Sequence, residues 1–261
     1  MQVRVGDVEI HYEMEGAEGA PFLTFSHSLA SSLELWDLQV ATLRREYRIL
    51  RFDTRGHGSS SAPLGPYSIE MLASDVIGLL DHLGIERTHF AGISMGGMIG
   101  QVLACRYGER IDRLVLANTT CRVAPEAAPL WEERIRTAET LGMEALAPDI
   151  LKRWLSDQFR RLQPELTERI HSMIVSTPVN GYVGCSRAIS TFDISNELRG
   201  VSAPTLIIAG GLDESVPLSA AMAIQEGIEG SELAVMPGAL HLSNIETSEP
   251  FTDAIGRFLE G

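Results

Sequence analysis

The stretch 90–98, Phe-Ala-Gly-Ile-Ser-Met-Gly-Gly-Met, limits what this chain can fold into more than any other part of the sequence. It contains one Gly-x-Ser-x-Gly motif, formed by Gly92, Ser94 and Gly96, and the run 98–105 after it has the apolar density of a buried helix. A strand that turns sharply through such a motif into a helix lifts the serine hydroxyl above the edge of a sheet. Both glycines are required because a Cβ at either position would crowd the strained serine backbone. A tight turn with an incidental serine is the alternative, and the flanking strand and helix favour catalysis.

The charge balance narrows the class of partner. The chain has 21 basic against 35 acidic side chains and a net charge of −14, which argues against a nucleic-acid partner. The same charge repels anionic substrates at long range, so an acidic substrate would need a cation in its pocket. We therefore expect a small-molecule substrate, and homo-oligomer formation stays open.

The cysteines and the hydropathy pattern bear on the compartment. Cys105, Cys121 and Cys185 are too few and too scattered for a disulfide framework or a zinc site. The segment 1–7 carries charge at once and has no apolar core, so we expect no signal peptide. No apolar stretch approaches the roughly 20 residues of a membrane-spanning helix. The expected compartment is the cytoplasm, with no membrane partner.

Strand and helix patterns alternate through most of the chain, which predicts an α/β fold with a mostly parallel sheet and helices on both faces. The expected strands are 3–5 and 8–13 (a hairpin), 22–26, 48–53, 87–91, 113–118, 205–209 and 232–236. The expected helices are 36–47, 68–83 with Ser68 at its start, 98–105, 219–228 and 251–259.

The pattern changes between residues 121 and 189. Strand signals disappear there, and helices are expected over 131–141, 143–159 and 164–175. We predict a core domain formed by residues 1–120 and 190–261, with residues 121–189 inserted as a helical cap.

A serine hydroxyl is a poor nucleophile at neutral pH, so Ser94 needs a base within hydrogen-bond reach and a group that orients this base. Active sites in open α/β sheets lie at the carboxyl ends of the strands, so the partners should follow strands directly. Asp213 follows the strand 205–209 after a short turn, and His241 follows the last strand. The order Ser94, Asp213, His241 predicts a nucleophile, acid and base triad.

Other residues compete for these roles or complete them. His57, in a glycine-rich loop after a strand, is the rival base. Asp53 is the rival acid, but we expect it to have a structural role together with Arg55. The developing oxyanion needs two backbone donors. We expect the amides of Met95 and Leu29 to supply them, with Ser28 as the alternative to Leu29.

Over its whole length the chain resembles the α/β-hydrolases, and more narrowly the 3-oxoadipate enol-lactonases of aromatic-compound catabolism. Many α/β-hydrolases share the elbow, the run 27–29 and the run 52–59. The runs 180–185 (Asn-Gly-Tyr-Val-Gly-Cys), 203–213 and 241–246 (His-Leu-Ser-Asn-Ile-Glu) strengthen the narrower resemblance. The resemblance implies hydrolysis of a small five-membered enol-lactone with an acetate arm through an acyl-enzyme, without metal or organic cofactor.

An acetate arm calls for a cation in the pocket. The predicted cap offers the basic residues Arg134, Arg136, Lys152, Arg153 and Arg187. Arg134 lies three residues after Trp131 and shares a helix face with it. We expect Trp131, Arg134 and Trp154 to line the substrate pocket. The alternative is that they belong to the solvated face or the packing of the cap helices.

Three other functions fit the same triad. A broader carboxylesterase or lactonase, including one for acyl-homoserine lactones, would need an apolar acyl channel. A lyase of the menaquinone route would aim several arginines at a polyanionic substrate, and a hormone receptor on this fold would report the ligand through its cap. Ser94 stands where a dehalogenase needs an aspartate, which argues against that chemistry.

Overall fold

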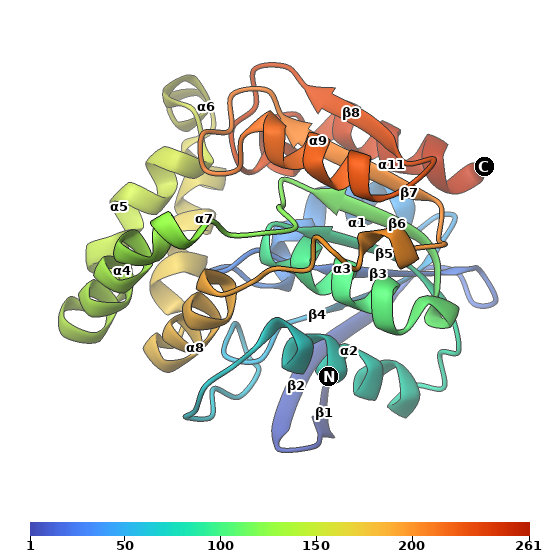
Figure 1. Cartoon of the computed structure of the whole chain (residues 1–261), viewed down its shortest axis with the longest axis horizontal. Coiled ribbons are helices and arrows are strands. Elements are labelled where there is room, and N and C mark those ends of the chain that lie inside the picture. The colour runs from blue at the N-terminus through green and yellow to red at the C-terminus, as the bar shows by residue number, and fades with distance from the viewer.

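The computed structural model describes all residues from Met1 to Gly261, and its centre is one eight-stranded sheet (Figure 1). At one edge the hairpin of β1 (Gln2–Val5) and β2 (Val8–Glu15) pairs antiparallel with β4 (Arg48–Phe52). The remaining strands are parallel, in the order β4, β3 (Phe22–Ser26), β5 (Thr88–Ile93), β6 (Ile111–Ala117), β7 (Thr205–Gly210) and β8 (Glu232–Met236). The prediction of a mostly parallel α/β sheet is confirmed.

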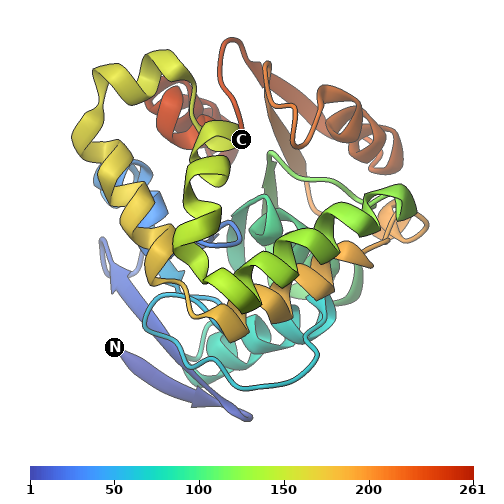
Figure 2. The same cartoon turned by 90° about the vertical axis from the view of Figure 1, so that its left-hand side faces the viewer.

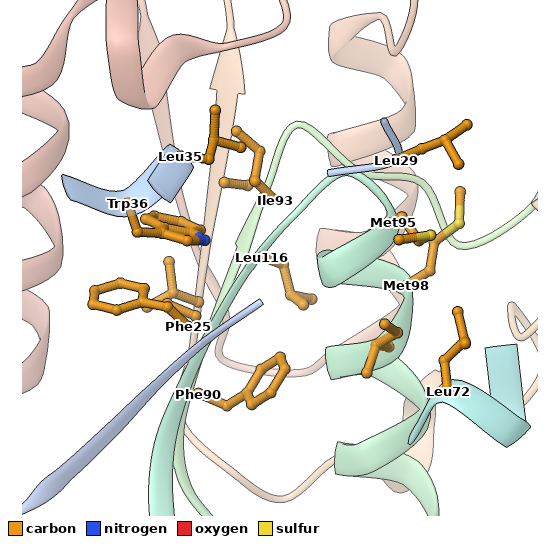
Figure 3. Packing of buried hydrophobic residues seen from close by; sticks show 14 of the residues in the cluster. Phe25, Leu29, Leu35, Trp36, Leu72, Phe90, Ile93, Met95, Met98 and Leu116 are labelled. Atoms are coloured by element: carbon orange, nitrogen blue, oxygen red, sulfur yellow. The ribbon is translucent and has the colours of Figure 1, made fainter. Parts of the chain in front are cut away.

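Helices cover both faces of this sheet, which explains why its central strands are apolar almost throughout. Phe25 of β3 stacks on Trp36 with ring centroids 4.5 Å apart, whereas Phe90 of the neighbouring β5 points to the opposite face (Figure 3). Behind the sheet in Figure 1 lie α1 (Asp37–Leu43) and α11 (Ser248–Glu260). In front of it lie α2 (Ile69–His82), α3 (Met95–Arg106) and α9 (Leu218–Gly227). The sheet, with the elbow between β5 and α3 at its edge, is therefore enclosed between two layers of helices.

Ser68 lies at the start of α2, as expected. The Ser68 hydroxyl accepts a hydrogen bond from the amide of Met71 at 3.1 Å. Such a bond satisfies one of the amides that lack a partner in the first turn of a helix. None of the helices is both long and apolar enough to cross a membrane.

Five helices lie between β6 and β7, gathered at one end of the molecule and viewed from that side in Figure 2. They are α4 (Ala128–Leu141), α5 (Met143–Trp154), α6 (Asp157–Leu162), α7 (Pro164–Ser176) and α8 (Val179–Ser190). We call this segment the helical insertion. The exact division into a core and a cap at residues 121 and 189 stays a prediction.

Three helix predictions need correction. The helix expected over 36–47 is a 3-10 turn, Leu33–Trp36, followed by the shorter α1. The helix expected over 143–159 breaks after Trp154, because Ser156 begins a new helix and its hydroxyl accepts a bond from the amide of Phe159 at 3.2 Å. The segment 179–190 was not predicted as a helix, yet it forms α8.

The glycines of α8 explain why the sequence pattern concealed this helix. Glycine disfavours helix interiors, but Gly181 faces the loop after β4, where a Cβ would lie 1.9 Å from the carbonyl oxygen of Gly56. Likewise, a Cβ on Gly184 would lie 2.6 Å from the ring of Tyr67. The glycines of the run 180–185 therefore allow the helical insertion to pack closely on the core.

Candidate active site

Ser94 sits at the sharp turn between β5 and α3 with φ 55° and ψ −115°, a backbone conformation that non-glycine residues rarely adopt. A Cβ on Gly92 would lie 2.1 Å from the carbonyl oxygen of Gly96, and one on Gly96 would lie 2.2 Å from that of Ser26. The two glycines of the motif are therefore fixed by close backbone contacts. The turn is held by a bond from the Ser94 amide to the carbonyl of Ala117 at 2.8 Å.

The three predicted triad residues meet at this turn. His241 Nε2 lies 3.0 Å from Ser94 Oγ, and His241 Nδ1 lies 2.7 Å from Asp213 Oδ2. Both distances are within hydrogen-bond range, and both partner side chains follow the carboxyl ends of their strands. The arrangement can remove the serine proton and stabilise the imidazolium that results.

Asp213 is buried, yet its surroundings favour the charged form. Burial opposes ionisation, but the charge of His241 and hydrogen bonds from His241, Asn118 and Val216 outweigh it and hold the pKa of Asp213 below its usual range. Oδ1 accepts from the amides of Ser215 at 2.9 Å and Val216 at 3.0 Å. A carboxylate with these donors can keep the imidazole oriented without taking up its proton.

His57, the rival base, has a structural role. It is fully buried, and its Nε2 accepts a hydrogen bond from the amide of Ala30 at 3.0 Å. Burial and the charge of His27 lower the pKa of His57 to about 3, so the ring is neutral at physiological pH. His57 Nε2 is bonded to the Ala30 amide and holds the loop after β3, whereas the hydrogen-bond partner of the Ser94 hydroxyl is His241.

Asp53 and Arg55 have structural contacts, as expected. The carboxylate of Asp53 accepts bonds from the amides of Leu33 at 2.8 Å and Ser59 at 2.9 Å. The guanidinium of Arg55 pairs with Asp75 at 2.7 Å. Both side chains anchor the glycine-rich loop after β4 away from the triad.

The two amides expected to bind an oxyanion both lie at the site. Leu29 lines the cavity above Ser94, and its amide has no acceptor within the protein. Met95 is the first residue of α3, where amides lack partners within the helix. Ala30, next to Leu29, is held at φ 58° with its amide bonded to His57, so the loop presents the Leu29 amide in a fixed place.

A cavity of about 1030 Å³ opens onto Ser94 and His241. It lies between the core and the helical insertion, and 17 of its 31 lining residues are hydrophobic. A volume of this size accommodates a small organic molecule with room to spare. Trp131, Arg134 and Trp154, which were predicted to line a pocket, all line it.

Two arginines of the insertion face this cavity without an acidic partner. Arg134 lies over the ring of Trp131, with Cζ 5.1 Å from the ring centroid, and Arg153 comes from the end of α5. Burial lowers the pKa of both guanidiniums, and the charge of Arg134 adds to the lowering for Arg153. No carboxylate lies within 4.0 Å of either group, although Asp149 also lines the cavity. An anionic ligand would relieve this unpaired positive charge.

The other candidate cations divide between the cavity and the surface. Lys152 lines the cavity but is exposed. Arg136 is exposed on α4 outside the lining, and Arg187 pairs with Glu139 at 3.4 Å. Trp154 is buried and stacks on the imidazole of His241, with centroids 6.4 Å apart and planes at 29°. It therefore forms the wall beside the candidate base.

Asn118 belongs to the site and was missed. It follows β6 directly at φ 44°, and its Nδ2 donates to Asp213 Oδ2 at 3.0 Å and to the carbonyl of Leu240 at 3.3 Å. Its Oδ1 accepts from the hydroxyl of Ser243. The sequence contained a signal for this residue, because Asn118 directly follows a strand, as the loops that carry Asp213 and His241 do.

The chain is similar to known proteins over most of its length. Residues 21–248 match the family model of the alpha/beta hydrolase fold. The 3-oxoadipate enol-lactonase 2 of Acinetobacter baylyi is 36% identical over 95% of this chain and 92% of its own length. A Stutzerimonas stutzeri protein whose name describes it as a candidate carbamate hydrolase is 30% identical over 94% of this chain and 95% of its own.

A solved structure is also similar to this chain along its whole length. The crystal structure of the enol-lactonase from Burkholderia xenovorans LB400 superposes with a TM-score of 0.97 at 38% identity. The match covers 100% of both chains.

Proposed function

The chain belongs to the α/β-hydrolase family, and we propose that it hydrolyses 3-oxoadipate enol-lactone to 3-oxoadipate through an acyl-enzyme on Ser94. Its class, a hydrolase of carboxylic esters or lactones, follows from the family and its enol-lactonase relatives. One observation supports the specific substrate. Ser94, His241 and Asp213 are aligned by hydrogen bonds, and the cavity onto which Ser94 and His241 face is lined by two arginines without carboxylate partners.

In the acylation step Ser94 Oγ attacks the ring carbonyl while His241 Nε2 takes its proton. Asp213 stabilises the imidazolium, and the amides of Leu29 and Met95 receive the developing oxyanion. The ring C–O bond then breaks and releases an enolate that is still tethered to the acyl group. Protonation by His241 and tautomerisation to the ketone prevent this enolate from closing the ring again.

In the deacylation step His241 removes a proton from water, which attacks the acyl-enzyme. The Ser94 ester bond breaks, the hydroxyl takes the proton back from His241, and the open diacid leaves. Each step uses side chains and amides of this chain.

Arg134 and Arg153 are the residues that we expect to bind the acetate arm. The net charge of −14 makes a local cation necessary for an anionic substrate, and these two guanidiniums face the cavity without carboxylate partners. Arginine binds carboxylates through paired donors in a fixed plane. Trp131 holds Arg134 from one side and limits where its guanidinium can lie.

The test compares the free acid of the enol-lactone with its methyl ester. We expect the wild type to prefer the acid, and Arg134→Ala and Arg153→Ala each to lose about 10- to 100-fold in kcat/KM on the acid alone. Arg136→Ala, on the same helix but outside the cavity, is the matched control and should behave as wild type. Equal losses on both substrates would refute carboxylate binding by these arginines.

A broader carboxylesterase is the second candidate, because part of the cavity is apolar. Val123, Ala127 and Leu130 line it from the insertion side, and Val216 and Ala223 line it from the core. These residues offer the apolar channel that a longer acyl or alkyl chain needs. Turnover of butyl esters at a kcat/KM within about tenfold of the enol-lactone would favour this function.

A further inference from the structure

Glu246 ends the run 241–246 and takes no part in the steps above, yet its carboxylate joins two segments of the site. Oε2 accepts a hydrogen bond from the amide of Leu240 at 2.6 Å, and Oε1 accepts one from the amide of Ser156 at 2.8 Å. A further bond runs from the amide of Leu242 to the carbonyl of Trp154 at 3.2 Å. The residues on both sides of His241 are therefore tied to the segment 154–156.

The position of His241 depends on such ties because it lies in an irregular loop between β8 and α10 (Ser243–Glu246). The carbonyl of Leu240 accepts from Asn118 and the carbonyl of Leu242 accepts from amides of α10, but no strand ladder holds the loop. Hydrogen bonds to a carboxylate are stronger than those to a neutral acceptor. The candidate base must nevertheless keep its Nε2 about 3.0 Å from Ser94 Oγ. A displacement of about 1 Å in such an arrangement costs about 100-fold in rate.

The segment held by Glu246 also carries substrate-facing residues. Arg153 and Trp154 end α5 and line the cavity, and Trp154 stacks on the imidazole of His241. The end of α5 therefore forms both a wall of the cavity and the support of the base.

We propose that Glu246 is a positioning residue that fixes His241 against Ser94 and couples the base to the end of α5. The proposal rests on the proposed function only in taking Ser94 and His241 as the reacting pair, and it holds whatever the substrate is. Glu246 forms no hydrogen bond with either of these two side chains, so it acts through the backbone of Leu240 and Ser156.

The experiment measures Glu246→Ala and Glu246→Gln by two readouts. One is kcat and KM on an ester or lactone substrate, and the other is the rate at which a small sulfonyl fluoride modifies Ser94. In that reaction Ser94 Oγ bonds to sulfur, fluoride leaves and His241 takes the proton. Glu249→Gln is the matched control, because Glu249 is exposed and forms no hydrogen bond or ion pair.

We expect kcat and the modification rate to fall together by about 10- to 100-fold in Glu246→Ala, with KM changed by less than about threefold. Glu246→Gln should lie in between, because its amide keeps one accepting oxygen. Glu249→Gln should match the wild type. Thermal unfolding verifies that each variant is folded, and Glu246→Gln carries the test if the alanine variant is not.

A folded variant with unchanged kcat and modification rate, or with a raised KM alone, would overturn the proposal. The sulfonyl fluoride needs no lactone, so this outcome differs from failure of the proposed function. If the wild type were not modified at Ser94 at all, the nucleophile assignment itself would fall, and the role of Glu246 with it.

Discussion

Replacing Asn118 tests how the acid of the triad is held. Asn118→Gly removes the bond to Asp213 Oδ2 at 3.0 Å, the bond to the carbonyl of Leu240 at 3.3 Å and the acceptor for Ser243. Glycine is the right first substitution because residue 118 has φ 44°, which glycine adopts without strain. The variant therefore isolates the loss of the side-chain amide.

The magnitude follows from the contacts that remain. A hydrogen bond to a charged group contributes about 1.5–3 kcal/mol. Asp213 keeps its bonds to His241 and to the amides of Ser215 and Val216, so we expect the lower end of this range. A loss of about 1.4 kcal/mol in transition-state stabilisation is a tenfold fall in kcat/KM.

The assay is steady-state hydrolysis of p-nitrophenyl acetate, with denaturant unfolding measured in parallel. Asn118→Ala should show the same fall in kcat/KM as the glycine variant, with an additional loss of about 1–2 kcal/mol in the free energy of unfolding from the left-handed backbone. A folded Asn118→Gly with kcat/KM within about twofold of wild type would refute the reasoning.

Two further predictions concern the scaffold. The fold lowers the pKa of His57 from 6.5 to about 3. As the pH falls, His57 therefore takes up a proton in the unfolded chain before it does so in the folded one. Its contribution to the free energy of unfolding is full above pH 6.5 and is lost as the pH falls toward 3. Between these two pH values, this group should lower the free energy of unfolding by about 1.4 kcal/mol per pH unit. Urea unfolding of His57→Gln should therefore show a flatter pH dependence than that of the wild type. The same pH dependence in both proteins would contradict this prediction. Gly181→Ala places a Cβ 1.9 Å from the Gly56 carbonyl oxygen and should lower the free energy of unfolding by about 1–3 kcal/mol. Gly200→Ala, which meets nothing within 4 Å, should stay within about 0.5 kcal/mol, and equal effects of the two substitutions would show that the close contact costs nothing.

The sequence predicted the triad because one physical rule places its members. Ser94, Asp213 and His241 each follow a strand, and parallel strands bring their carboxyl ends to one edge of the sheet. The same rule applied to the end of β6 would have found Asn118. It was missed because an amide side chain does not act as an acid or a base, so its residue type gave no reason to select it.

Other features needed the folded chain. His57 was left as a rival base because only the structure shows its Nε2 on the Ala30 amide. The selection of Arg153 over Arg136 and Arg187 depends on where α5 ends, and this end is set by Ser156 and the distant Glu246. The helix α8 was hidden because its glycines serve contacts with Gly56 and Tyr67, which are far away in sequence.

The most direct test of the account is the ultraviolet loss of 3-oxoadipate enol-lactone on addition of the purified protein, with Ser94→Ala as control. The account predicts fast loss at micromolar substrate with wild type, with turnover of about 1 per second or more, and none above background with Ser94→Ala. Ser94-dependent cleavage of simple esters without loss of the enol-lactone would contradict the proposed substrate. Loss of the lactone at an equal rate with Ser94→Ala would contradict the acyl-enzyme itself.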